Sequence, residues 1–276
     1  MTEWEYMTDE GSKCPFFILG GIFMNSFIPW IGGKKLLRKE IVKRFPQYIN
    51  RYVEVFGGAA WVLFYKEKYA KQEVYNDINS DLVNLFQCIK KYPKEVLQEL
   101  KFTLNAREIF NKFRQDYNKK ELTDIQRAAM FYYIIRTSYG AKLEHYSANY
   151  RSPYLLLQNA EKISKRLSKV VIENKSFTDI LTRYDKEGTL FYCDPPYYKA
   201  EKLYNMGDDV FGEEQHILLR DSLRNIKGHF VLSYNDDEFI KKLYEGFDIQ
   251  EVERSSNLSL NNGKKGMYKE LIISNC

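Results

Sequence analysis

The spacing of apolar residues divides the chain into three regions, and in the first of them short apolar runs alternate with amphipathic stretches. Short apolar runs favour buried strands, and apolar positions three or four residues apart favour helices. The strands expected in this region are Tyr52–Phe56 and Glu73–Tyr75, and the expected helices are Lys34–Phe45, Trp61–Tyr69 and one that contains Leu82–Ile89 and closes at Pro93.

The last third of the chain repeats this alternation. Its expected strands are Val170–Glu173, Leu190–Cys193, Phe230–Ser233 and Leu271–Ser274, and a helix from about Glu213 to Ile226 ends at Gly228. Strands that alternate with helices form a mostly parallel sheet with helices on both faces. The sequence therefore predicts one α/β sheet whose strands come from both ends of the chain.

The region between them has the pattern of helices. Thr123 and Gln126 fit a capping box, which starts a helix that runs to about Arg136. We expect four parts: an N-terminal extension at 1–26, the first part of the α/β domain at 27–93, a helical insertion at 94–168 and the second part of the α/β domain at 169–276. The sequence leaves open whether translation begins at Met1 or Met24.

Composition excludes several classes of protein. The chain has 276 residues, 44% hydrophobic and 29% charged, which excludes a disordered or low-complexity protein. No apolar run reaches the roughly 20 residues of a membrane-spanning helix, so no membrane association is expected. The four cysteines stand far apart with no CxxC pair, which argues against a disulfide framework or a zinc site and favours a cytoplasmic location.

Positive charge gathers in the middle of the chain. The net charge is +5, but residues 90–170 hold 17 Lys and Arg against 8 Asp and Glu, a local balance of +9. Such a segment suits a polyanion, because neutralised phosphates release condensed counterions. Solvated helix faces would explain the same pattern, and charge alone does not separate the two interpretations.

Glycines or acids follow three of the expected strands, at Gly57-Gly58, Asp77 and Asp194. The carboxyl ends of parallel strands form the ligand-binding edge of an open sheet. Glycines there let the backbone approach a ligand, and an acid about 20 residues further on can accept hydrogen bonds from both hydroxyls of a ribose. Glycines also occur in ordinary turns, but the ordered set favours a nucleoside cofactor.

The tetrapeptide Asp194-Pro195-Pro196-Tyr197 follows the apolar run that ends at Cys193. Its two prolines fix φ and keep the backbone rigid. The carboxylate of Asp194 and the carbonyl of Pro195 can accept two hydrogen bonds from one amino group, and the Tyr197 ring offers a face on which a base can stack. An ordinary turn is the alternative, which the apolar run before it and the aromatic residue after it make weaker.

With these residues the chain resembles the Dam-like DNA adenine methyltransferases. Asp194–Tyr197 looks like the DPPY motif of amino-group DNA methyltransferases, and Phe27–Lys34, with Trp30 before Gly32-Gly33-Lys34, looks like their amino-terminal cofactor motif. Other segments that resemble family motifs are Tyr52–Ala60, Asn76–Asn79, Phe230–Asp236 and Glu270–Asn275. The resemblance runs from about residue 27 to the end and is specific through the order and spacing of the motifs.

The resemblance implies a Rossmann-like S-adenosylmethionine-dependent methyltransferase sheet with an inserted helical target-recognition domain. It implies S-adenosylmethionine as the methyl donor and double-stranded DNA as the substrate. The residues implied to bind the cofactor are Trp30, Lys34, Phe56, Gly57, Asp77, Phe177 and Asp194. Phe177 could equally be a core residue. A phosphate-loop role for Lys34 is rejected, because no Ser or Thr follows it and no strand and glycine precede it at the required spacing.

The residues implied to act in catalysis are Asp194, Pro195, Pro196 and Tyr197. The amino nitrogen of adenine is a poor nucleophile, and hydrogen bonds to Asp194 and to the Pro195 carbonyl would aim its lone pair at the methyl group. Transfer is expected to be direct, so positioning dominates and Cys193 is expected to be a strand residue rather than a nucleophile. The target base is expected to leave the duplex and stack on Tyr197.

The insertion takes the place of the family's target-recognition domain. Its candidates for contacts to phosphates or base edges are Arg136, Lys142, His145, Tyr146 and Arg151. Residues 136–142 depart from the Asn-Gly-Leu and Arg pattern of members that read GATC, so the recognition sequence stays open. Phe131, Tyr132 and Tyr133 are expected in the helix core, and His216 is expected at the surface.

Two other functions remain open. One is a non-catalytic protein that senses S-adenosylmethionine and binds DNA, and the other is an enzyme that methylates RNA or the amino group of cytosine. Asp194 opens the motif where protein and some RNA enzymes carry Asn, which favours DNA. The resemblance fits a bacterial or phage enzyme in the cytoplasm, associated with the nucleoid through DNA, and either solitary or paired with a cognate restriction endonuclease.

Overall fold

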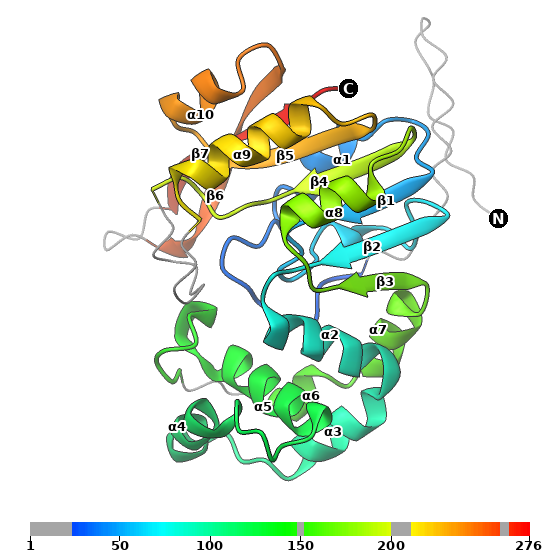
Figure 1. The fold of residues 1–276 in the computed structure, drawn as a ribbon. Helices are drawn as coiled ribbons and strands as arrows, with labels where there is room; N and C mark the ends of the chain where they lie inside the picture. Colours follow the sequence, from blue (N-terminus) through cyan, green and yellow to red (C-terminus); the bar gives the residue numbers. More distant parts are fainter. Residues whose placement is uncertain (1–23, 148–151, 200–210, 260–264) are drawn as a thin grey trace, which may run out of the picture.

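The computed structural model describes residues 24–147, 152–199, 211–259 and 265–276 (Figure 1). Of the expected N-terminal extension, residues 1–23 lie outside the described residues. Met24 is buried in the hydrophobic core, and its amide N–H donates to the carbonyl of Phe64. Among the helices of the described ranges, none has both the length and the apolar character needed to cross a membrane.

Seven strands of the described chain form one sheet in the order β3-β2-β1-β4-β5-β7-β6. The strands from β3 to β5 in this order run parallel, and β7 pairs antiparallel with both β5 and β6. The predicted α/β fold with a mostly parallel sheet is therefore confirmed. The strands are β1 Arg51–Glu54, β2 Gln72–Asn76, β3 Val170–Glu173, β4 Thr189–Cys193, β5 His229–Asn235, β6 Asp248–Ser259 and β7 Lys265–Ser274.

Helices cover both faces of the sheet, and a group of them lies beyond its β3 edge (Figure 1). The α-helices are α1 Arg38–Lys43, α2 Ser80–Lys91, α3 Pro93–Lys101, α4 Arg107–Asp116, α5 Asp124–Thr137, α6 Pro153–Leu156, α7 Ala160–Leu167, α8 Phe177–Tyr184, α9 Glu213–Arg224 and α10 Glu238–Leu243. Two short 3₁₀ helices are η1 Leu63–Tyr65 and η2 Tyr139–Ala141.

The two faces of the sheet pack into two hydrophobic clusters. Side chains alternate along β1, so that Tyr52 joins one cluster while Val53 and Val55 join the other. The cluster around Val53 includes residues of α8, α9 and α10, and the cluster around Tyr52 includes residues of α1, α2 and the insertion helices. Glu54 of β1 lies between Val53 and Val55, so its side chain points to the opposite face of the sheet, which packs against the insertion helices.

The helical insertion shares its core with α2, which packs against α3, α5 and α7. The predicted capping box of Thr123 and Gln126 is present at the start of α5. Phe131, Tyr132 and Tyr133 are buried in this helix, which confirms their predicted place in the core. The insertion limits of residues 94 and 168 stay a prediction, because one continuous core joins these helices to α2.

Two predicted helices are much shorter in the structure, and in both cases a tertiary contact competes with the helix. Only α1 forms within Lys34–Phe45, and the Lys34 side chain before it instead pairs with Asp194, its Nζ 2.8 Å from Oδ2. Only η1 forms within Trp61–Tyr69, because the Leu63 N–H donates to the carboxyl group of Glu54 at 2.8 Å.

Two further differences concern the last third of the chain. The prediction that His216 lies at the surface is wrong, because it is fully buried on α9 with its Nδ1 at 2.6 Å from the Tyr234 hydroxyl. The edge strand β6 was not predicted, since polar residues separate Ile249 and Val252 and no apolar run marks it. Edge strands commonly carry charged side chains, which prevent pairing with other chains.

Candidate active site

A cavity of about 370 Å³ opens at the carboxyl edge of the sheet. Its walls come from the loop before α1, the ends of β1, β2 and β4, and the loop that follows α5. Six of the seven residues predicted to bind the cofactor line it: Trp30, Lys34, Phe56, Gly57, Asp77 and Asp194. The seventh, Phe177, is not among the lining residues. Its ring packs against that of Phe56, with 5.8 Å between the centroids, so its cofactor contact stays a prediction.

The buried side chain of Asn76, at the end of β2, joins three strand ends beside the cavity. Its Nδ2 donates to the carbonyls of Val55 at 2.9 Å and Lys175 at 3.1 Å, and its Oδ1 accepts from the Lys175 N–H at 2.9 Å. Val55 follows β1 and Lys175 follows β3, so one amide holds the ends of β1, β2 and β3 in register.

Asp77 follows Asn76 and points its carboxylate at the cavity with a fixed orientation. The Gly58 N–H donates to Oδ2 and the Asn79 N–H donates to Oδ1, both at 2.8 Å. Gly58 has φ +49°, a left-handed conformation that favours glycine. Burial raises the pKa of Asp77, and the hydrogen bonds from Asn79 and Gly58 oppose this rise. Each oxygen keeps a lone pair for a further donor.

Asp194, at the end of β4, forms an ion pair with Lys34. The Lys34 Nζ lies 2.7 Å from Oδ1 and 2.8 Å from Oδ2 of Asp194, and the Lys34 side chain is 5% exposed. The Ser233 hydroxyl also donates to Oδ1, at 2.9 Å. Burial raises the pKa of Asp194, while the Lys34 ammonium lowers it. Three donor contacts therefore fix a carboxylate that remains 17% exposed.

The rest of the tetrapeptide continues from this ion pair. Pro195 and Pro196 are buried, and Pro196 lines the cavity. The Tyr197 ring centroid lies 4.7 Å from the Lys34 Nζ, and the Tyr197 hydroxyl donates to the Glu270 carboxylate of β7 at 2.5 Å. Both the ring and the hydroxyl of Tyr197 are thus held next to Asp194. Cys193 is a buried residue of β4, as predicted, and burial raises the pKa of its thiol.

The family model of the D12 class N6 adenine-specific DNA methyltransferases matches residues 30–258. The chain belongs to this family. Type II methyltransferase M.MjaIII of Methanocaldococcus jannaschii is 30% identical over 90% of this chain and 98% of its own length. Type II methyltransferase M1.LlaDCHI of Lactococcus lactis subsp. cremoris is 26% identical over 92% and 96%, and the DNA adenine methylase of Escherichia coli K12 is 24% identical over 90% and 94%. The predicted Dam-like family and adenine-specific DNA methyltransferase activity are therefore confirmed.

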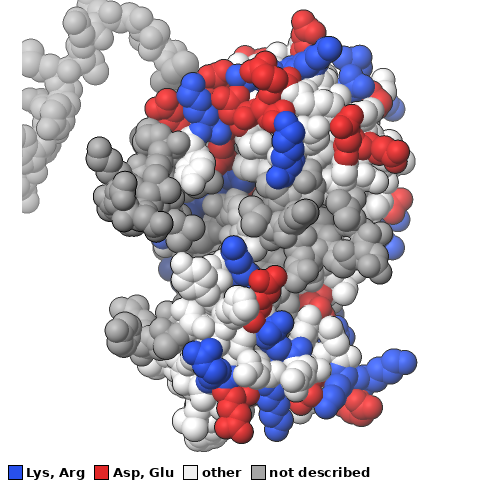
Figure 2. Space-filling model, turned by 90° about the vertical axis from the view of Figure 1, so that its left-hand side faces the viewer, with Lys and Arg blue, Asp and Glu red and all other residues white. Residues whose placement is uncertain are grey.

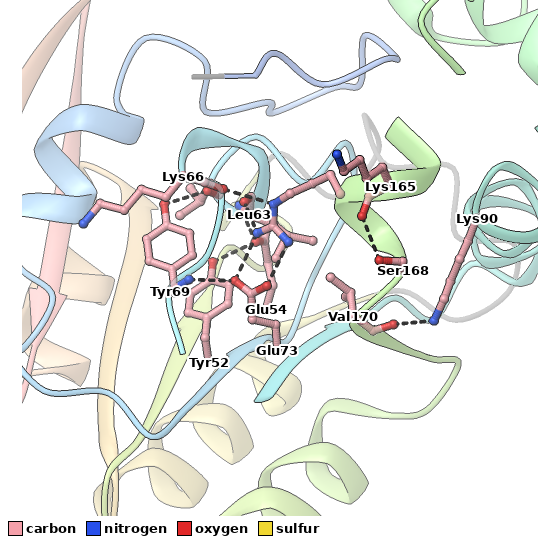
Figure 3. Close-up of polar contacts among 12 residues, drawn as sticks. Tyr52, Glu54, Leu63, Lys66, Tyr69, Glu73, Lys90, Lys165, Ser168 and Val170 are labelled. Carbon is pink, nitrogen blue, oxygen red and sulfur yellow. Dashed lines mark hydrogen bonds and ion pairs between the residues drawn. The ribbon is translucent and has the colours of Figure 1, made fainter. Parts of the chain in front are cut away.

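Glu54 of this methyltransferase also lines the cavity, although it was not among the predicted site residues. The Tyr52 hydroxyl and the Leu63 N–H both donate to its Oε2, at 2.7 and 2.8 Å (Figure 3). The side chain is buried, and burial raises the pKa of Glu54 to about 8. A single carboxylate inside the apolar run Tyr52–Phe56 was the signal that could have revealed it, because unpaired charges are rare in buried strands.

The loop after α5 brings the insertion to the cavity through Ala141, Lys142 and Leu143. Ala141 has φ +58° and Leu143 has φ +64°, and Ala60, another lining residue, has φ +55°. Residues other than glycine rarely adopt this backbone conformation, and strained residues of this kind are often found at functional sites. The irregular backbone on both segments is therefore consistent with an active site.

Of the described residues predicted to contact DNA, two are exposed and two form hydrogen bonds within the protein. Lys142 and His145 have exposed side chains on the loop after α5. Arg136 instead donates to the Tyr132 hydroxyl and to the carbonyl of Phe27, which ties α5 to the loop before α1. The Tyr146 hydroxyl donates to the Asn105 side chain at 3.0 Å.

Arg151 lies outside the described residues. On the face drawn in Figure 2, Lys and Arg side chains are spread over the lower, helical part of the molecule, with several acidic ones between them, and acidic side chains gather at the opposite end. The insertion is therefore the more basic part of this face, in line with the charge distribution of the sequence.

Proposed function

We propose that this enzyme transfers a methyl group from S-adenosylmethionine to the exocyclic amino group of an adenine that is flipped out of duplex DNA. One observation carries the proposal. The ion pair of Lys34 and Asp194 and the oriented carboxylate of Asp77 face a single cavity that is also lined by Trp30 and Phe56. Polar groups that converge in an otherwise apolar cavity are typical of a small-molecule site.

The lining residues suit this cofactor. Asp77 keeps lone pairs for two ribose hydroxyls, and the rings of Trp30 and Phe56 provide apolar surface for a base. Asp194 supplies a carboxylate at the cavity wall, and the buried Glu54 adds a carboxyl group that can form hydrogen bonds. When bound, S-adenosylmethionine supplies a methyl group on a positively charged sulfur, which needs no nucleophile from the enzyme.

The protein's part in the reaction is to position the target amino group. Asp194 would accept one hydrogen bond from it, and the carbonyl of Pro195 would accept the other. Lys34 and Ser233 hold the Asp194 carboxylate in place, so little reorganisation is needed when the base arrives. Tyr197, held through its ring and its hydroxyl, would stack on the flipped base.

The insertion at 94–168 would recognise the DNA, and residues 27–93 and 169–276 would form the catalytic domain. Lys142, His145 and Arg151 are the proposed contacts to phosphates or base edges. An enzyme that acts on duplex DNA would meet its substrate in the cytoplasm of a bacterium or of a phage-infected cell. Because two relatives are type II methyltransferases, we also propose a cognate restriction endonuclease whose cleavage this methylation blocks.

The test is to express the protein in a methylation-deficient bacterium and to sequence the genomic DNA by a single-molecule method that reports modified bases. Methylated adenine in one short motif supports the proposal, and the Asp194→Ala variant should leave the genome unmodified. An unmodified genome from a folded protein that binds S-adenosylmethionine would contradict it, and would favour RNA methylation or a non-catalytic sensor of the cofactor.

A further inference from the structure

A buried ion pair joins the last helix of the insertion to the sheet, outside the residues assigned to catalysis or cofactor binding. Arg166 of α7 lies 2.8 Å from Oε2 and 3.0 Å from Oε1 of Glu73 on β2. Their side chains are only 5% and 4% exposed. Burial of two charges is costly unless further hydrogen bonds satisfy them, so the remaining contacts of Arg166 show what the pair accomplishes.

The remaining donors of Arg166 go to the segment that follows the cavity wall. Its Nη2 donates to the carbonyl of Leu63 at 2.7 Å, and its Nε donates to the carbonyl of Lys66 at 3.0 Å. Four protein oxygens thus surround one planar guanidinium, a geometry that lysine cannot reproduce. The segment is also held at Tyr69, whose N–H donates to Glu73 at 2.9 Å and whose hydroxyl donates to the Val62 carbonyl at 2.8 Å.

Leu63 connects the hydrogen bonds of Arg166 to the cavity. Its carbonyl accepts from Arg166. Its N–H donates to the buried carboxyl of Glu54 (Figure 3). Glu54 lines the cavity, and so do the four residues before Leu63, from Ala59 to Val62. Only a 3₁₀ turn at Leu63–Tyr65 follows them, so no regular helix fixes this wall.

We propose that Arg166 is a positioning residue for the cofactor cavity. It holds Leu63 in place, so that the Leu63 N–H orients Glu54 and the wall from Ala59 to Val62 keeps its shape. The inference rests on the proposed use of this cavity for S-adenosylmethionine. It assigns to the insertion a second task besides DNA recognition, because α7 braces the cofactor site from the face of the sheet that carries Glu54.

The test compares Arg166→Met with Arg51→Met. Arg51 lies at the other end of the strand that carries Glu54 and donates to Gln72, Tyr184 and Thr189, so its loss removes a similarly bonded arginine far from the cavity edge. The probe is S-adenosylhomocysteine, titrated through the fluorescence of Trp30 and Trp61, which both line the cavity. Arg166→Met should raise the dissociation constant about tenfold, equivalent to about 1.4 kcal/mol, and Arg51→Met should leave it unchanged.

Kinetics separate positioning from a general loss of structure. Arg166→Met should raise KM for S-adenosylmethionine with kcat within about twofold, because it weakens ground-state and transition-state binding alike. Arg166→Lys should recover only part of the affinity, because an ammonium cannot reach all four oxygens.

A double variant tests whether charge neutralisation is the whole role of Arg166. The double variant Arg166→Met/Glu73→Gln leaves no buried charge unpaired, so we expect it to fold. It still lacks the hydrogen bond to the Leu63 carbonyl. We expect its affinity for S-adenosylhomocysteine to stay about tenfold below that of the wild type. Wild-type affinity in the double variant would overturn the inference. Wild-type protein that binds no S-adenosylhomocysteine would instead overturn the proposed cofactor, which keeps the two failures distinct.

Discussion

At the carboxyl edge of the sheet, Lys34, Asp77 and Asp194 direct their charges into one cavity, whereas in the helical insertion Arg136 and Tyr146 form hydrogen bonds with the protein itself. All of them were selected from the sequence as functional residues. Polar groups at the strand ends are available to a ligand, while half of the described candidates in the insertion stabilise its attachment or its internal packing.

The difference follows from the geometry of the two regions. The carboxyl ends of parallel strands meet at one edge, so residues that follow β1, β2 and β4 are brought together by the topology alone. Helices impose no such meeting point. An arginine on a helix reaches whichever acceptor lies within its long side chain, and here a backbone carbonyl before α1 is close enough to bind Arg136.

The largest expected effect is at the strand ends. Asp194→Ala should lower kcat by at least about 100-fold, because it removes the proposed acceptor for the target amino group. DNA affinity, measured by fluorescence anisotropy, should remain close to that of the wild type. Cys193→Ala is the matched control one residue away, and we expect it to keep kcat within about twofold, since transfer needs no thiol.

Equal loss of methyl transfer and DNA binding in Asp194→Ala would contradict its catalytic role. A large loss of kcat in Cys193→Ala would contradict direct transfer. Either result would remove the distinction between cavity residues and their neighbours in the strand.

The second prediction concerns the pH dependence of folding stability that Glu54, at the same edge of the sheet, introduces. Burial raises its pKa to about 8, far above that of a glutamate in the unfolded chain. Between these two pKa values the native state holds a proton that the unfolded state has released. The contribution of Glu54 to stability is therefore complete below the unfolded pKa and is lost as the pH rises through about 8, by up to about 1.4 kcal/mol per pH unit.

Glu54→Gln should remove this slope. Urea unfolding at pH 5, 6.5 and 8 should show a free energy of unfolding that falls less steeply with pH in the variant than in the wild type. Glu40→Gln, at a glutamate of α1 far more exposed than Glu54, is the control. Identical pH dependence in the wild type and Glu54→Gln would contradict a protonated Glu54 in the native state.

The sequence allowed prediction of the parallel sheet and of most strands, because their apolar runs are a local signal. It also located the Asp194–Tyr197 tetrapeptide at the end of β4 and the six cofactor candidates that line the cavity, because strand ends converge. The segment Trp61–Tyr69 was beyond local prediction, since its helix is replaced by bonds from Leu63 to Glu54 and Arg166. His216 was mispredicted for a similar reason: its partner Tyr234 is supplied by another element.

Arg136→Met should have an intermediate effect and should act on stability rather than on DNA binding. It leaves the carbonyl of Phe27 and the hydroxyl of Tyr132 without their donor, which should cost about 2 kcal/mol of the free energy of unfolding. Urea unfolding measures the cost, and a DNA-binding assay on the folded variant should show little change. If the variant is as stable as the wild type but loses DNA affinity, Arg136 contacts DNA and the prediction is wrong.

The smallest effect is expected for Lys142→Met, which tests the opposite behaviour within the insertion. Lys142 is exposed, and its neighbours Ala141 and Leu143 line the cavity, so a base that enters the cavity brings its phosphates close to this lysine. Loss of one phosphate contact should lower the slope of log K against log salt by about one and leave stability within about 0.5 kcal/mol. Lys162→Met, at an exposed lysine on α7, is the control for a mere change of net charge. If both variants shift the slope equally, the basic surface attracts DNA without a specific contact at the cavity, and the insertion would then recognise its target through other residues.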